Sequence, residues 1–147
     1  MFESPTRHIP ELEGAGGYGE WIVDRESKAA PDDPMAFPFV GYNRAVRAVE
    51  EAVYEFVDNH PEFELTNYAE ILESKGLKWD MESMKGADIS AFDGQCVVAL
   101  LLAASRADRF CEGALLEFFE SGCVLRWLHR LREIDEASAR ALITLSC

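Results

Sequence analysis

The sequence predicts a single α+β domain, predominantly helical, in which a small N-terminal β-hairpin packs against a helical bundle. Three observations lead to this prediction. The 147 residues are 48% hydrophobic, which suits one core that needs neither disulfides nor metal. Proline and glycine interrupt residues 1–42, whereas residues 43–134 carry apolar side chains at the three- and four-residue spacing of helices. Residues 135–147 keep some apolar character without a stop signal, and we treat them as a C-terminal extension.

The proline-rich N-terminal region is expected to be irregular, with short strands as its only regular structure. Residues 20–23 and 37–42 are the two strand candidates, joined by a polar loop over residues 24–33, and Pro38 confines the second strand to an edge. Residues 14–19 match the glycine spacing of dinucleotide-binding loops. That motif requires a strand before it and a helix after it, so here the glycines indicate a turn.

The first helices begin after the hairpin. Asn43 is placed to cap a helix that ends before Pro61, because the residue before a proline is pushed out of helical geometry. Asn67 and Glu70 have the spacing of a reciprocal cap for a second helix, which Gly76 closes as a left-handed stop. Residues 79–87 contain a further short turn.

The C-terminal half is the most regular part of the chain. Residues 90–93 resemble a cap for a helix that is apolar on nearly every side, with Phe92 at the start of its apolar face, and we expect this helix to lie at the centre of the fold. A second helix covers residues 114–119 and stops at Gly122, and a third covers residues 124–131. The aromatic side chains of this region are expected in the core, together with Trp21 and Tyr42.

The charge of the chain is strongly acidic, with a formal net charge of −13. Residues 1–105 carry 20 acidic against 8 basic side chains, whereas residues 106–147 carry 7 against 6. A field of this sign repels phosphate backbones and anionic lipids, which disfavours direct nucleic-acid or membrane-surface binding. It attracts basic proteins, including those that bind nucleic acids. Solubility is the simplest alternative explanation of the charge.

The four cysteines occur without a C-x-x-C pair and are expected to be reduced structural thiols: Cys96, Cys111, Cys123 and Cys147. No secretory or membrane-spanning pattern is visible, so a cytoplasmic protein without a required cofactor is expected. Folding could gather Cys111, Cys123 and His129 into a zinc site, but their spacing matches no known ligand pattern.

Residues 106–113 are the most chemically mixed segment and lie between two apolar helical segments. Its candidate partner-binding residues are Arg106, Asp108, Arg109 and Glu112. Asp108 and Glu112 suit the first turn of a helix, where amide dipoles favour negative charge, and either arginine could pair with them. The two arginines could also clamp an anionic small ligand.

In the main enzymatic alternative, Cys111 acts as a nucleophile. Neighbouring positive charge lowers the pKa of a thiol, so Arg106 and Arg109 could make Cys111 reactive. Such a nucleophile also needs a base, and the sequence does not position His60 or His129 for that role. A half-buried structural cysteine is therefore the favoured interpretation. The nearby carboxylates, including Glu117 and Glu120, are a second enzymatic alternative.

The segment 106–113, the residues 119–122 and the pattern Leu125-x-x-Leu128-x-Arg130-Leu131 resemble the domain of unknown function 6508, found in small prokaryotic and viral proteins. Residues 13–21 and 37–42 are similar to this family too, so the resemblance covers most of residues 10–134. It implies one compact domain of prokaryotic or phage origin. It implies no activity and no site residues.

Together these observations favour a non-enzymatic acidic module that binds a basic protein or protein complex. Its most specific form is a phage or mobile-element inhibitor of a host nucleic-acid-binding defence complex. The alternatives are a small hydrolase or transferase that uses Cys111 or nearby carboxylates, and a sensor of an anionic small ligand. A homodimer would follow if Phe118, Phe119 and Trp127 exceed what one core can bury.

Overall fold

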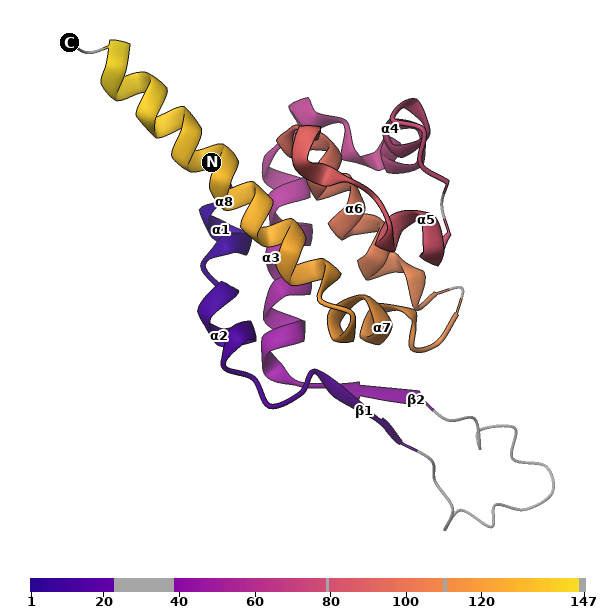
Figure 1. Cartoon of the computed structure of the whole chain (residues 1–147). Helices are drawn as coiled ribbons and strands as arrows, with labels where there is room; N and C mark the ends of the chain where they lie inside the picture. Colours follow the sequence, from indigo (N-terminus) through magenta and orange to yellow (C-terminus); the bar gives the residue numbers. More distant parts are fainter. Residues whose placement is uncertain (23–38, 79, 110, 146–147) are drawn as a thin grey trace, which may run out of the picture.

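The computed structural model describes residues 1–22, 39–78, 80–109 and 111–145 of the chain. It shows a mostly helical domain with a small two-stranded antiparallel sheet at one end, which confirms the predicted fold class (Figure 1). In chain order the elements are α1 (Glu3–Thr6), α2 (Ile9–Glu13), β1 (Gly19–Ile22), β2 (Phe39–Tyr42), α3 (Arg44–Asn59), η1 (Pro61–Phe63), η2 (Leu65–Asn67), α4 (Tyr68–Ser74), α5 (Met81–Lys85), η3 (Ile89–Ala91), α6 (Gly94–Ala107), α7 (Ala114–Glu120) and α8 (Cys123–Leu145).

Helix α6 lies at the centre of the fold, as its apolar sequence predicts. Asp93 caps it by accepting a hydrogen bond of 3.0 Å from the amide of Cys96. Every side chain from residue 96 to residue 104 is buried, because α3, α4, α7 and α8 all pack against this helix. Burial raises the pKa of the Cys96 thiol to about 11, so this cysteine is a structural thiol.

Helix α3 follows β2 directly and is positioned by the predicted cap. The Asn43 side chain accepts a hydrogen bond of 3.0 Å from the amide of Val46. The buried face of α3 includes Val46, Val49 and Phe56 and packs on α1 and α6. The hairpin is therefore tied through Asn43 to a helix that belongs to the core.

Helix α4 ends as predicted but begins differently. Gly76 has a φ of +78°, and the amide of Leu77 donates to the carbonyl of Leu72 at 3.0 Å, which is the hydrogen bond of a left-handed glycine stop. The predicted reciprocal cap at Asn67 is wrong, because its side chain makes no capping hydrogen bond. Asn67 instead ends the preceding 3-10 turn η2, whose backbone leads straight into α4.

The N-terminal residues differ most from the prediction, because two short helices, α1 and α2, replace the expected irregular chain. Pro10 lies in the first turn of α2, where its missing N–H would be unpaired in any case. Phe2, Ile9 and Leu12 are buried as α1 and α2 pack on α3 and α8. Tertiary packing thus stabilises helices that are too short to form alone.

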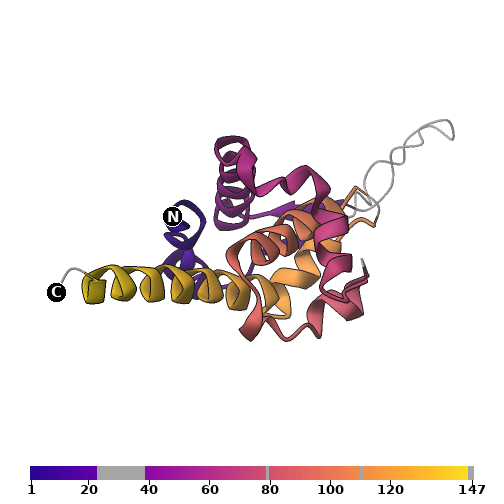
Figure 2. The ribbon, with the colours of Figure 1, turned by 90° about the horizontal axis from the view of Figure 1, so that it is seen from above.

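Helix α8 is longer than the predicted third helix and includes most of the C-terminal extension. Its C-terminal turns extend away from the body of the domain (Figures 1 and 2). Phe118, Phe119 and Trp127 are at most 3% exposed, so one core buries all three and they offer no apolar surface for a homodimer. No described helix is long and apolar enough to span a membrane.

The sheet confirms the predicted hairpin over residues 19–22 and 39–42, while the other predicted strand residues, 23, 37 and 38, lie outside the described part. Trp21 pairs with Val40 and Gly19 with Tyr42. Directly paired residues share a face of a sheet, and Val40 is buried. The hairpin therefore directs Trp21, Val40 and Tyr42 towards the helices. Trp21 nevertheless stays 49% exposed, so its predicted place in the core is wrong.

Candidate functional site

The junction between α6 and α7, residues 108–113, lies within the segment 106–113 that the sequence singles out. Its backbone reverses direction through hydrogen bonds from the amide of Arg109 to the carbonyl of Arg106 and from the amide of Cys111 to the carbonyl of Ala107. Gly113, with a φ of +89°, then starts α7. The junction lies beside the sheet, so the charged residues between the helices meet the hairpin (Figure 1).

Asp108 joins α7 to the hairpin. Its Oδ1 accepts a hydrogen bond from the amide of Leu115 at 2.9 Å. Asp108 itself ends α6 and does not lie in the first turn of α7, contrary to the prediction, but its carboxylate binds an amide at the start of that helix. Its Oδ2 accepts a hydrogen bond from the Tyr42 hydroxyl at 2.5 Å, and that hydroxyl accepts one from the amide of Leu116 at 3.1 Å. Burial and the bond to Asp108 raise the pKa of Tyr42 well above its ordinary value, so the phenol stays protonated and donates.

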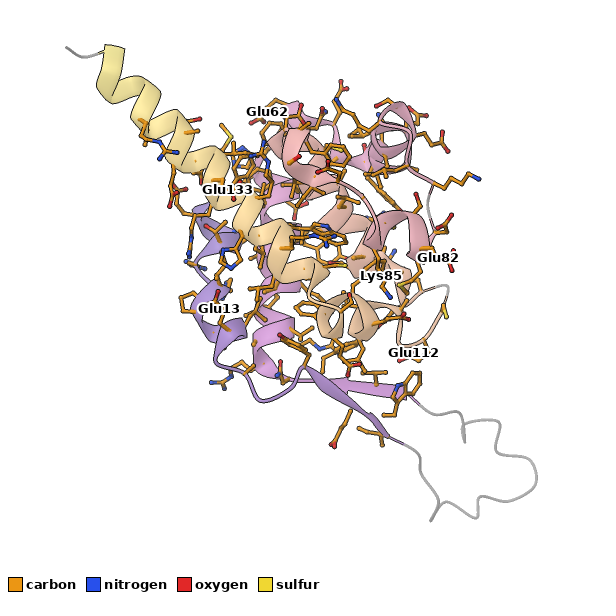
Figure 3. All side chains as sticks on the ribbon, viewed as in Figure 1. Glu13, Glu62, Glu82, Lys85, Glu112 and Glu133 are labelled. Atoms are coloured by element: carbon orange, nitrogen blue, oxygen red, sulfur yellow. The ribbon has the colours of Figure 1, made fainter. Side chains whose placement is uncertain are left out.

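Glu112 joins the junction to the edge of the sheet. Its Oε1 accepts a hydrogen bond of 3.0 Å from the amide of Val40. Since the amide of Asn43 donates to the carbonyl of Tyr18 across the sheet, the alternating ladder turns the amide of Val40 outward. Glu112 thus satisfies an edge amide that the hairpin itself leaves unpaired. Figure 3 shows Glu112 between α7 and the sheet.

Gly113 receives the indole of Trp21. A Cβ atom at Gly113 would lie 2.2 Å from Cζ2 of Trp21, far inside van der Waals contact. Only glycine combines the positive φ with this close approach. The junction therefore holds the hairpin through three neighbouring contacts, made by Asp108, Glu112 and Gly113.

The arginines do not pair with these carboxylates, contrary to the expectation. In the part of the chain that the structure describes, no ion pair joins Arg106 or Arg109 to Asp108 or Glu112, since backbone amides and Tyr42 bind those oxygens instead. The guanidinium of Arg106 lies over the ring of Tyr68, 5.5 Å from its centroid. Arg106 is half-buried, whereas Arg109 is exposed.

Two further residues, Arg47 and Glu50, belong to this cluster and were missed in the sequence. The guanidinium of Arg47 lies 5.2 Å from the ring centroid of Tyr42 and 3.5 Å from Oε2 of Glu50. Burial raises the pKa of Glu50, Arg47 partly opposes that shift, and the charge of Asp108 adds to it. The i, i+3 spacing of Arg47 and Glu50 was the available signal, but only the fold brings the pair to Asp108.

A family model described as "Family of unknown function (DUF6508)" matches residues 6–137. The chain belongs to this family. The match confirms the resemblance of the junction and hairpin motifs, since it covers both strands and the α6–α7 connection. The DUF6508 match ends within α8, before its C-terminal turns. No curated protein and no solved structure matched the chain.

Cys111 of the DUF6508 domain is exposed, which corrects the expectation of a half-buried thiol. Its side chain lies on the outside of the junction because the backbone turns there to enter α7. The histidines considered as its base are engaged elsewhere. His60 stacks on Phe56, with ring centroids 4.1 Å apart, and His129 contacts Glu13 at 2.9 Å.

Metal ligation was the other alternative for this thiol. Cys123 is buried and lies 3.3 Å from the hydroxyl of Ser121. Among the described residues, no group of three or more His, Cys, Asp or Glu side chains could hold a metal ion.

Proposed function

We propose that this protein is a non-enzymatic interaction module that binds a basic protein partner through its acidic surface. One observation carries the proposal. Between Arg47 and Lys75 the chain has eight carboxylates and no lysine or arginine. Seven of these carboxylates are exposed on α3, η1, α4 and the turns between them: Glu51, Glu55, Asp58, Glu62, Glu64, Glu70 and Glu73.

We call these seven residues the acidic surface. They lie mainly towards the end of the domain remote from the hairpin, where Glu62 is labelled in Figure 3. A concentration of one sign of charge draws oppositely charged proteins into encounter and repels nucleic acids and anionic membranes. The charge of the acidic surface therefore supports a basic protein as the class of partner.

The junction contributes to this proposal through its accessible members. Arg109 and Glu112 are exposed and can reach a partner. Asp108 is half-buried and bonded to Tyr42 and Leu115, so its part would be to hold the hairpin in place.

The more specific form of the proposal is a cytoplasmic inhibitor, encoded by a phage or mobile element, of a host defence complex that binds nucleic acid. An acidic surface can occupy a basic channel that otherwise takes a phosphate backbone. We therefore expect the captured partner to release a labelled nucleic acid when this protein is added. A partner that keeps its nucleic acid bound would contradict the inhibitor while leaving the interaction module intact.

The test is affinity capture from cells of the encoding organism at moderate salt. We expect a basic protein to be retained, and the variant Glu70→Gln/Glu73→Gln on α4 to bind it more weakly. The variant Glu11→Gln/Glu136→Gln is the control, because it removes the same charge at exposed positions outside the acidic surface. The proposal fails if no basic protein is retained, or if the two variants bind equally well.

A further inference from the structure

The surface beside the junction is hollowed at two adjoining places that share Met81, Cys111 and Ala114. The first hollow has a volume of about 230 Å³ and the second of about 440 Å³. We call their union the Cys111 groove. Its first hollow is lined by Asp80, Met81, Met84, Ala107, Cys111, Ala114 and Phe118. Its second is lined by Trp21, Met81, Cys111, Glu112, Gly113, Ala114, Leu116, Glu117 and Glu120.

The floor of the groove is apolar and firmly held. Met84 and Phe118 are at most 2% exposed and belong to the core. One wall is the half-exposed indole of Trp21, which is held over Gly113 by the hairpin contacts described above. A half-exposed tryptophan beside an apolar hollow is the kind of anchor that protein interfaces use.

The rim of the groove is acidic. Four carboxylates line it, those of Asp80, Glu112, Glu117 and Glu120. One of them, Glu117, is paired with Lys85 at 3.0 Å. Lys85 and Glu112 face the same side of the molecule in Figure 3. This charge is complementary to a basic segment, and it repels a second copy of this chain, whose net charge is −13.

We propose that the Cys111 groove docks a segment of the basic partner in which an aliphatic side chain neighbours a lysine or arginine. This inference rests on the proposed function and names the recognition site within it. The aliphatic side chain fills the first hollow against Met84 and Phe118. The cation lies against the face of Trp21 and between the rim carboxylates, where cation–π and ionic attraction act together. The acidic surface steers the encounter, and the groove supplies the short-range recognition.

The experiment selects binders from a display library of random peptides of about 12 residues, incubated with the full chain at moderate salt. We expect the enriched peptides to contain lysine or arginine next to leucine, isoleucine or methionine. These peptides are then synthesised and titrated against variants. Cys111→Phe fills the groove at an exposed position, and Cys111→Ser keeps its space and is the matched control.

We expect Cys111→Phe to weaken these peptides at least tenfold and Cys111→Ser to leave their affinity unchanged. Glu112→Gln/Glu120→Gln should weaken them as well, since glutamine keeps an acceptor for the amide of Val40 and removes only the charge. The control for charge is again Glu11→Gln/Glu136→Gln.

The outcomes separate the two proposals. Basic peptides that bind all variants equally would overturn the groove and leave the acidic module standing. A selection without enrichment of basic residues would overturn the proposed function, and the groove with it.

Discussion

The substitution Gly113→Ala tests whether the junction holds the hairpin in the way the structure indicates. The added methyl group has two separate effects. It places a Cβ on a residue with a φ of +89°, and that Cβ would lie 2.2 Å from Cζ2 of Trp21. Gly76→Ala is the matched control, because Gly76 has a φ of +78° and no atom within 4 Å of the corresponding Cβ.

The two effects have different magnitudes. The positive φ alone costs an alanine about 1–2 kcal/mol. Trp21 is 49% exposed, so about half of a side chain of roughly 250 Å² is buried. At about 25 cal/mol per Å² that burial contributes about 3 kcal/mol if Trp21 is displaced completely. We therefore expect Gly113→Ala to lower the free energy of unfolding by about 4 kcal/mol, and Gly76→Ala by about 1–2 kcal/mol.

The assay is urea denaturation followed by far-ultraviolet circular dichroism, which does not depend on the tryptophan being replaced. A double-mutant cycle with Trp21→Ala isolates the contact. In the Trp21→Ala background, Gly113→Ala should cost only the about 1–2 kcal/mol of backbone strain. Equal costs of Gly113→Ala in the two backgrounds would refute the packing of Trp21 on Gly113.

Three further predictions concern the same region. Tyr42→Phe removes the hydroxyl between Asp108 and α7 and should lower the free energy of unfolding by about 2 kcal/mol in urea denaturation; an unchanged midpoint would contradict the bond. Burial raises the pKa of Glu50 in the folded state, so its favourable neutral form is lost as the pH rises, and Glu50→Gln should stabilise the protein more at neutral than at acidic pH. The reverse pH dependence would disprove this assignment. Exposed Cys111 should react with N-ethylmaleimide far faster than buried Cys96, whose pKa of about 11 leaves about one thousandth as thiolate at pH 8; peptide mapping that finds equal rates would contradict the burial.

Several elements could be predicted from the sequence because their signals are local. Asn43 caps α3 as its side-chain chemistry indicates, and Gly76 stops α4 where a left-handed residue is required. The cap of α6 falls within the predicted residues 90–93, at Asp93, so the helix begins after Phe92 and does not include it. Asn67 shows the limit of this reasoning. Its spacing to Glu70 matches a cap, but the preceding 3-10 turn already determines the backbone.

The N-terminal helices could not be predicted for a related reason. α1 and α2 span 4 and 5 residues, too few to form without the surfaces of α3 and α8. Their stability comes from burying Phe2, Ile9 and Leu12 against helices that are distant in the sequence. Segments this short cannot show the repeated spacing of apolar residues by which longer helices are recognised.

The candidate site was located from the sequence but not understood from it. Mixed charge marked residues 106–113, and the family match confirmed the motif. The partners of Asp108 and Glu112 are Tyr42 and Val40, which lie 66 and 72 residues earlier in the chain. No local rule predicts contacts over such separations.

The sequence by itself determined the helical class, the central α6, the hairpin and the acidic charge, since each depends on side-chain types and their spacing along the chain. Only the tertiary structure decided what the junction does. The hairpin has an unpaired edge amide at Val40, a phenol at Tyr42 and an indole at Trp21, and folding brings all three to Glu112, Asp108 and Gly113. Hydrogen bonds and close packing require proximity in space, and proximity across so much of the chain is a property of the whole fold.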